Sequence, residues 1–458
     1  MTKDRAREPE SSVQQAPRLT TTMTRLDRGT LQRKVIRTLV ATQILGGVGM
    51  ASGIAVGALL AEQISGTEAL AGVGTTSQVL GSALITIPVA RVIAGHGRRM
   101  GQSLGLGVAF VGAALVITAA VANSFPLFLV GMFLFGGGTT ANNQARYAAA
   151  DLAEPAHRGR DLSIVVWATT IGSVVGPNLI GPGVTVARLV GIPDLAGCFI
   201  FSLAGFLLAW LVVNRLLRPD PLLTARALEA TEHEERAQRH TAGVAEGTTT
   251  GPAPEAPNHD GSMRRGMSVI RANTPALLAV LVMGLGHLVM VSVMVMTPIH
   301  MKHGDAELEV IGFVISIHIL GMYVLAPVVG TAVDRWGGRV IAMLGGVILA
   351  IASGLAALSE AGWSVLLLIA LFLLGVGWSC TLVSGSTLLT AAVATDERPA
   401  TQGLADVFMG LAGAGGGAVA GVVVGSLGYA WLAGASAVVG VVILVIGAAM
   451  SRASSRVA

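Results

Sequence analysis

The sequence predicts an all-α, multi-pass membrane protein, on three observations. The 458 residues are 53% hydrophobic and 12% charged, with a mean hydropathy of +0.71, whereas a soluble domain has about 25% charged residues. Twelve apolar runs of roughly 20 residues are each long enough to cross a bilayer as a helix. If both termini are cytoplasmic, the segments on that side hold all 30 Lys and Arg residues except Arg188 and Lys302. Such an excess marks the cytoplasmic side of a membrane protein.

The first six predicted spans are joined by short polar turns. Residues 1–35, which precede them, are polar and charged, so we expect a cytoplasmic tail without a signal peptide and a first span that directs insertion. The six spans form a predicted N-terminal bundle, 36–217. They cover residues 36–60, 70–92, 101–122, 124–147, 162–186 and 195–217.

A long polar segment, 218–272, separates these spans from six more. Its charged part, Ala225 to His240, predicts a short surface helix, and its Gly-, Thr- and Pro-rich part, Gly243 to Pro257, predicts a flexible cytoplasmic linker. A C-terminal bundle, 273–450, and a cytoplasmic tail, 451–458, follow. The spans of this second bundle cover residues 273–299, 308–330, 339–358, 363–390, 401–424 and 429–450.

The two halves repeat one pattern at the same ordinal position. The fourth span is followed by a polar turn from Asp151 to Asp161, and the tenth by one from Asp396 to Asp406. Each turn contains Pro, then Gly, then an acid that opens a Gly-rich helix. The repetition predicts a 6+6 duplication, and two such halves facing a midplane site are typical of transporters.

The turn after the eighth span has the pattern Gly330-x-x-x-Asp334-Arg335-x-Gly337-x-Arg339. It resembles the loop signature of the major facilitator superfamily. Gly337 permits a tight turn, Asp334 can face the positive N-terminus of a neighbouring helix, and the two arginines anchor the cytoplasmic face. The resemblance implies two six-helix bundles that rock around a midplane cavity, driven by an ion gradient, since no ATP-binding loop is present.

The equivalent turn of the first half departs from this signature. It keeps Gly97, Arg98 and Arg99 but has Ala94 where the family has Asp. Asp406, which opens the eleventh span, has two interpretations. It partly replaces the lost acid, or it is a plain acid at a helix N-terminus, which is the preferred interpretation.

The fifth span resembles a signature of the superfamily's drug:proton antiporters, with Gly172, Gly176 and Pro177, although Gly181 lies one residue late. Pro177 predicts a kink, and the first two glycines are expected to pack against a helix of the other half. A second antiporter signature, an Arg deep in the fourth span, is absent, because Met132 occupies that position.

The charges inside the spans constrain the substrate. No Asp or Glu lies at the centre of a span, and Gln43 stands where exporters of cationic drugs commonly have an acid. Because a buried cation needs a nearby negative charge, a neutral or anionic substrate is favoured. Arg146 either snorkels to the cytoplasmic surface or is buried, and both alternatives stay open.

Polar, aromatic and sulfur-containing side chains inside the spans are the candidates for substrate contact, because such groups in a membrane helix face the bundle interior. The candidates for binding are Gln43, Gln78, Asn142, Asn143, Trp167, His287, Met290, Met294, His318 and Trp378. His titrates near neutral pH, so His287 and His318 are also candidate proton carriers, with Asp151, Asp161 and Asp406 as rivals. Copper transport through the Met-rich seventh span is disfavoured, and we expect no metal and no cofactor.

The sequence therefore predicts a secondary transporter of the inner membrane that exports a small neutral or anionic organic compound in exchange for protons. The alternative is a proton-coupled symporter that imports a small organic anion with Arg146 as its charge partner. We expect neither enzymatic activity nor nucleic-acid binding. We expect a monomer in the lipid bilayer. The predicted gating residues are Gly330, Asp334, Arg335, Gly337, Arg339, Arg98, Arg99, Gly172, Gly176 and Pro177.

Overall fold

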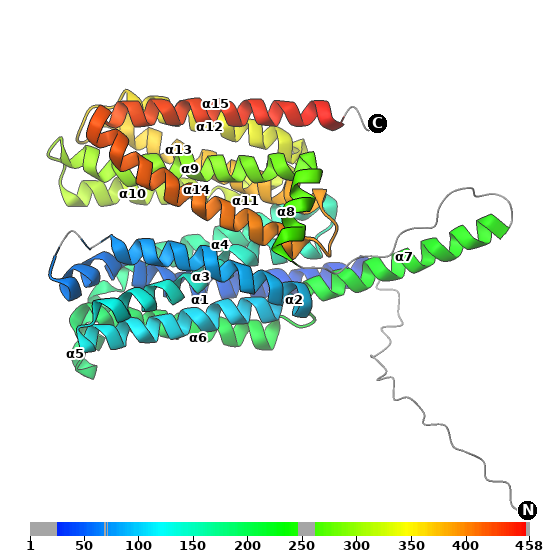
Figure 1. The fold of residues 1–458 in the computed structure, drawn as a ribbon, viewed down its shortest axis with the longest axis horizontal. Helices are drawn as coiled ribbons and strands as arrows, with labels where there is room; N and C mark the ends of the chain where they lie inside the picture. The colour runs from blue at the N-terminus through cyan, green and yellow to red at the C-terminus, as the bar shows by residue number, and fades with distance from the viewer. Residues whose placement is uncertain (1–24, 68–69, 71, 246–261, 455–458) are drawn as a thin grey trace, which may run out of the picture.

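The computed structural model describes residues 25–67, 70, 72–245 and 262–454, and these residues form α-helices, two short 3-10 turns and loops. Two helical bundles lie side by side, with α7 projecting beyond them (Figure 1). The first bundle contains α1 (Arg25–Ser65), α2 (Val73–Ala122), α3 (Phe125–Asp151), α4 (Arg158–Asn178), α5 (Ile180–Val190) and α6 (Gly197–Leu216). The second contains α9 (Thr274–Lys302), α10 (Leu308–Tyr323), α11 (Ala326–Trp336), α12 (Gly338–Ala357), α13 (Val365–Ala392), α14 (Arg398–Leu427) and α15 (Tyr429–Ser454).

The helices account for the twelve predicted crossings. In the described residues, ten helical stretches are long and apolar enough to span a membrane, and α4 with α5 forms an eleventh that bends by 56°. Helix α2 counts as one stretch, but its 50 residues extend about 75 Å, more than two bilayer crossings need. It is interrupted at Gly97, whose φ of 85° is left-handed. The all-α fold is confirmed.

The backbone at Gly97 also supports the duplication of the two halves. Gly337 occupies the matching position of the second-half loop and has a φ of 87°. At Gly97 a Cβ atom would lie 2.5 Å from the carboxyl carbon of Asp220, so glycine is required there for space as well as conformation.

The break predicted at Pro177 is confirmed, because α4 ends at Asn178 and α5 turns away from it. The predicted partner of the glycines before it is wrong. A Cβ at Gly172 would lie 2.7 Å from the Cα of Gly47, and one at Gly176 would lie 2.3 Å from the Cβ of Ala51. Both glycines therefore pack α4 against α1 of the same half. Small residues allow this close approach of helices in a membrane.

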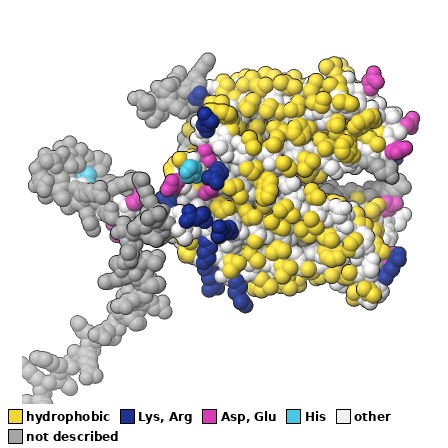
Figure 2. Space-filling view, turned by 180° about the vertical axis from the view of Figure 1, so that it is seen from behind, with side chains coloured by type: hydrophobic (Ala, Val, Ile, Leu, Met, Phe, Trp, Pro, Cys, Tyr) yellow, Lys and Arg dark blue, Asp and Glu magenta, His cyan; other side chains and the backbone are white. Residues whose placement is uncertain are grey.

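Lys and Arg side chains gather at one end of the two bundles, which we call the basic end (Figure 2). A wide apolar surface separates it from the opposite end. The basic end is defined by Arg99, Arg158, Arg226, Arg335 and Arg339, with Arg98 and Arg398 buried at the same end.

The connection between the bundles holds more helix than predicted. Helix α7 (Pro221–Ala245) has 25 residues, and α8 (Met263–Ala272) packs on the start of α14. Residues 246–261, which include most of the predicted flexible linker, lie outside the described residues. Helix α1 begins at Arg25, inside the predicted N-terminal tail, and the rest of that tail lies outside the described residues as well.

Candidate substrate cavity and gate

A cavity of about 850 Å³ lies between the two bundles. It is lined by α1, α2, α3 and α4 of the first bundle and by α9, α10, α13 and α14 of the second. The space-filling view shows a hollow between the bundles at the end away from the basic side chains (Figure 2). The cavity lining extends toward that end, as far as Thr75 and Thr76 at the start of α2.

The two walls of the cavity differ in chemistry. Most of the amides and hydroxyls in the lining come from the first bundle, and most of the sulfur-containing and aromatic side chains come from the second. The polar wall contains Gln43, Gln78, Thr139, Asn142, Asn143, Thr169 and Ser173. The opposite wall contains His287, Met290, Met294, Met322, Tyr323, Trp378 and Met409.

Eight of the ten predicted binding residues thus line one cavity, and two do not. Trp167 is partly buried against the hydrophobic core of the second bundle. His318 is fully buried, with its Nδ1 2.8 Å from the carbonyl oxygen of Leu371, so it joins α10 to α13. Helical periodicity shows which residues share a face, but not which face meets the cavity. The substrate contacts and the proton role of His318 stay predictions.

An ion pair between the two halves forms the charged part of the cavity wall. Arg146 Nη2 lies 2.5 Å from Asp406 Oδ1, and both side chains are buried. Gln144 donates to the other carboxylate oxygen of Asp406 at 2.8 Å, and Tyr147 accepts from Arg146 at 3.2 Å. Arg146 and Asp406 are the two Lys, Arg, Asp or Glu residues among the described residues that line the cavity.

This pair settles two open interpretations. Arg146 is buried and does not snorkel to the surface. Asp406 is not a plain helix-terminal acid, because α14 begins at Arg398, about two turns earlier. Its hydrogen-bond partners lie on α3, and one of them, Gln144, also bonds Arg98 of the first-half loop.

His287 is held by an aromatic neighbour in the same cavity. Trp378 Nε1 donates to His287 Nδ1 at 3.0 Å. Since indole nitrogen only donates, the accepting Nδ1 carries no proton, and in the neutral ring the proton is on Nε2. Tyr323 packs edge-on against Trp378, with ring centroids 5.6 Å apart.

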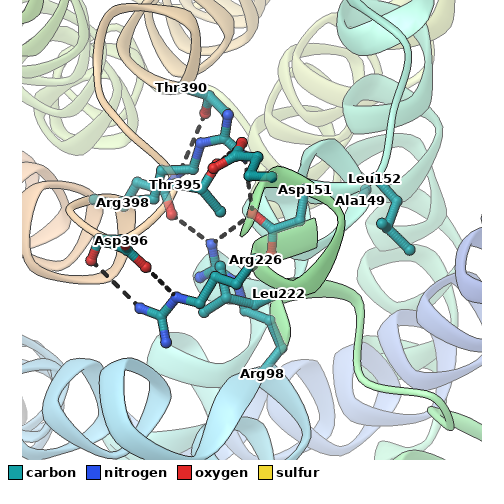
Figure 3. Close-up of polar contacts among 12 residues, drawn as sticks. Arg98, Ala149, Asp151, Leu152, Leu222, Arg226, Thr390, Thr395, Asp396 and Arg398 are labelled. Carbon is teal, nitrogen blue, oxygen red and sulfur yellow. Dashed lines mark hydrogen bonds and ion pairs between the residues drawn. The ribbon is translucent and has the colours of Figure 1, made fainter. Parts of the chain in front are cut away.

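The basic end of the cavity is closed by a buried polar network centred on Arg98. Its guanidinium contacts both carboxylate oxygens of Asp151, at 2.7 and 3.1 Å, and neither side chain is exposed (Figure 3). It also donates to Gln144 at 2.9 Å and, across the halves, to Gln402 at 2.6 Å. Asp151, a candidate proton carrier, is therefore part of this closure. Asp161, another candidate, accepts a 2.6 Å hydrogen bond from Gln32.

A second contact between the halves is formed by the signature loop. The two oxygens of Asp334 accept from the backbone nitrogens of Gly159 and Arg160, at 2.7 and 2.8 Å. These N–H groups belong to the first turn of α4, which begins at Arg158, and a carboxylate stabilises such free groups. A Cβ at Gly330 would lie 2.4 Å from the carbonyl oxygen of Gly159, so α11 and α4 touch backbone to backbone. Arg335 lies exposed over the Trp336 ring.

Comparisons with known proteins agree with this architecture. The family model described as Major Facilitator Superfamily matches residues 38–306 and 293–456. The chain belongs to the major facilitator superfamily. It is similar to the MFS-type transporter YdeG of Bacillus subtilis, with 39% identity over 399 residues and 87% of each chain covered. It is also similar to the riboflavin transporter RfnT of Brucella anthropi, with 27% identity over 389 residues, 83% of this chain and 86% of the relative.

Solved structures share the fold of this major facilitator protein. A bacterial homologue of the iron transporter ferroportin, in an outward-facing state, has a TM-score of 0.69 at 14% identity. The match covers 91% of this chain and 99% of the homologue's chain. The human organic anion transporter MFSD10 has a TM-score of 0.67 at 16% identity with the same coverage. The protein is thus a multi-pass membrane transporter and not an enzyme.

The first-half loop, which lacks the superfamily's acid at Ala94, is contacted by the linker helix. Arg226 of α7 donates to the carbonyl oxygen of Ala94 at 2.7 Å and forms a 2.8 Å ion pair with Asp396 of the second half (Figure 3). Glu229, one turn further on, accepts a hydrogen bond from Thr395. Sequence reasoning missed these contacts. The only signals were the missing acid and the charged stretch that follows Ala225.

Proposed function

We propose that this protein is a proton-coupled transporter that carries a small organic anion into the cell by alternating access. The observation that supports it is the pair of Arg146 and Asp406, shared between the two halves in the cavity wall. In this proposal Asp406 carries the proton and Arg146 binds the anion. The closed basic end faces the cytoplasm, as the excess of Lys and Arg on that side favours. The open cavity then faces outward.

Charge neutrality favours carrying the proton and the anion together. With Asp406 ionised, its charge balances that of Arg146. Protonation of Asp406 releases the guanidinium, and an anion that binds there restores neutrality. Binding of the anion alone, or of the proton alone, leaves one uncompensated charge. Such a charge in a closed membrane site costs several kcal/mol, so the complex that reorients contains both partners or neither.

Reorientation requires the contacts at the basic end to separate. These contacts include the Asp334 cap on α4, the bond from Arg98 to Gln402, and the Arg146–Asp406 pair itself. Loss of the pair on loading removes one of them. One chain supplies both walls of the cavity, so we expect the monomer to be the transport unit, in the inner membrane with both termini cytoplasmic.

Export by proton antiport is the second candidate, favoured by one observation. The break after Pro177, with Gly172 and Gly176 packed on α1, resembles the drug:proton antiporters. A neutral cargo fits this candidate, because it could bind while Arg146 and Asp406 remain paired. The similarity to a riboflavin transporter makes riboflavin a suitable neutral compound for a test panel.

Transport in proteoliposomes with an imposed pH gradient separates the two functions. Symport predicts that an outside-acid gradient drives accumulation of an anion above equilibrium. Antiport predicts that an inside-acid gradient does so for a neutral compound. The panel contains phenylacetate, 4-hydroxyphenylacetate, gluconate and riboflavin. Gradient-driven accumulation of riboflavin with the antiport sign, and of no anion with the symport sign, would overturn the proposal.

A further inference from the structure

We infer that the transported anion has a flat apolar body with a hydrogen-bond donor on one edge. This inference rests on the proposed function. The cavity offers three different partners for one ligand. They are the guanidinium of Arg146, an unpaired acceptor on Gln43, and the apolar wall around Met290, Met294 and Trp378. The substrate class is therefore a hydroxylated or N–H-bearing aromatic acid.

The unpaired acceptor on Gln43 requires a hydrogen-bond donor on the ligand. The side chain lines the cavity and is 4% exposed. Its Nε2 donates to Thr169 Oγ1 at 3.1 Å and to the carbonyl oxygen of Asn142 at 3.4 Å. Because a carbonyl oxygen can only accept, this contact fixes the amide with its nitrogen toward Asn142. Its Oε1 is left buried and has no hydrogen-bond partner among the described residues.

A buried acceptor without a partner is costly, and a ligand N–H or O–H at this position removes the cost. A ligand that lacks the donor leaves Gln43 unsatisfied once the cavity closes. Sites built to bond a substrate hydroxyl reject the analogue that lacks it far more strongly than an apolar pocket rejects a missing methylene. Gln43 should therefore determine specificity.

Gln43 and Arg146 reach the cavity near successive turns of α3. Gln43 bonds the backbone of Asn142, and Arg146 lies four residues later on the same helix, α3. Four residues rise about 6 Å along a helix. The donor and the acid group of the ligand are thus expected about one ring apart, as in a para-hydroxyaryl acid.

The opposite wall favours a flat apolar body. Met290 and Met294 lie one turn apart on α9, and Trp378 faces the same cavity from α13, fixed by its bond to His287. Thioethers adapt to ligands and make favourable contacts with aromatic rings. A sugar acid of similar charge could satisfy Arg146 and Gln43 but would face this wall with hydroxyl groups.

The test compares 4-hydroxyphenylacetate, phenylacetate and gluconate in proteoliposomes under an outside-acid gradient. In the wild type we expect the half-saturating concentration of 4-hydroxyphenylacetate to be roughly tenfold or more below that of phenylacetate, and gluconate uptake to be weak. In Gln43→Met the two aryl acids should become equivalent, through loss of affinity for the hydroxylated one. Gln102→Met is the matched control, since Gln102 is buried, lacks a partner among the described residues and does not line the cavity.

The outcomes separate this inference from the proposed function. Proton-driven gluconate uptake that equals or exceeds uptake of the aryl acids would leave the proposed function intact and overturn the inference. Equal half-saturating concentrations of the two aryl acids in the wild type would overturn the role of Gln43. This comparison uses the wild type alone, so it does not depend on whether a variant folds. If the gradient moves none of the three anions, both the proposed function and the inference fail.

Discussion

Gln144 and Asp406 share a 2.8 Å hydrogen bond across the two halves of the transporter. The amide oxygen of the same Gln144 accepts from Arg98 at 2.9 Å. One side chain thus connects the ion pair of the cavity to the buried network that closes the basic end. A change of charge at Asp406 therefore reaches the gate through a single residue.

Replacement of Gln144 by Leu should weaken that connection. The substitution leaves one nitrogen of Arg98 and one oxygen of Asp406 without a partner, at a cost of about 1–3 kcal/mol. We expect a lower melting temperature in detergent and greater access to the gate from the basic end. Labelling of a cysteine placed at Thr390, which is buried in this state, measures that access. Unchanged labelling and melting would show that Gln144 is not part of the closure.

The pair of Arg98 and Asp151 should behave as a buried ion pair. Asp151→Leu alone leaves an unpaired buried charge and should cost about 3–5 kcal/mol of stability. The double variant Arg98→Leu with Asp151→Leu should lose less than the single variant. A double-mutant cycle of thermal stabilities measures the coupling. Additive losses in the cycle would contradict the geometry.

The linker helix is predicted to stabilise the closed basic end through Arg226 and Asp396. Either residue changed to Ala should raise labelling at Thr390 and alter turnover, since the ion pair joins α7 to the second half. The exchanged pair, Arg226→Asp with Asp396→Arg, should recover part of the loss. Arg188, which forms an exposed pair with Asp194 at the opposite end, provides the control, because exposed pairs contribute little. Equal effects of Arg188→Ala and Arg226→Ala would contradict this role.

The fold could be predicted from the sequence because its determinants are local. Span length, the side of the Lys and Arg residues and the signature loop at Asp334 need no knowledge of packing. The same holds for the break at Pro177. These features specify twelve crossings, a duplication and a helix cap, and the structure contains all of them.

The site was predicted less completely, because the sequence of one segment does not show which distant segment it packs against. Asp406 could not be paired with Arg146 across 260 positions. His318 and Trp167 lie inside predicted spans, but His318 bonds a helix of its own bundle and Trp167 packs against the core of the second bundle, so neither lines the cavity. Arg226 lies in a stretch whose charges suggested only a solvated surface helix. The glycines of the fifth span indicated close packing without indicating the partner.

Uptake by Asp406→Asn in proteoliposomes tests the central claim most directly, namely that proton and anion bind together at Arg146 and Asp406. Asn cannot ionise, so Arg146 is left ready for an anion without a proton. We predict that this variant still exchanges a labelled anion across the membrane, but no longer accumulates it under an outside-acid gradient. Asp161→Asn serves as the control, because Asp161 lies outside the cavity lining, and it should keep gradient-driven accumulation. Accumulation by Asp406→Asn at the wild-type level would contradict the account.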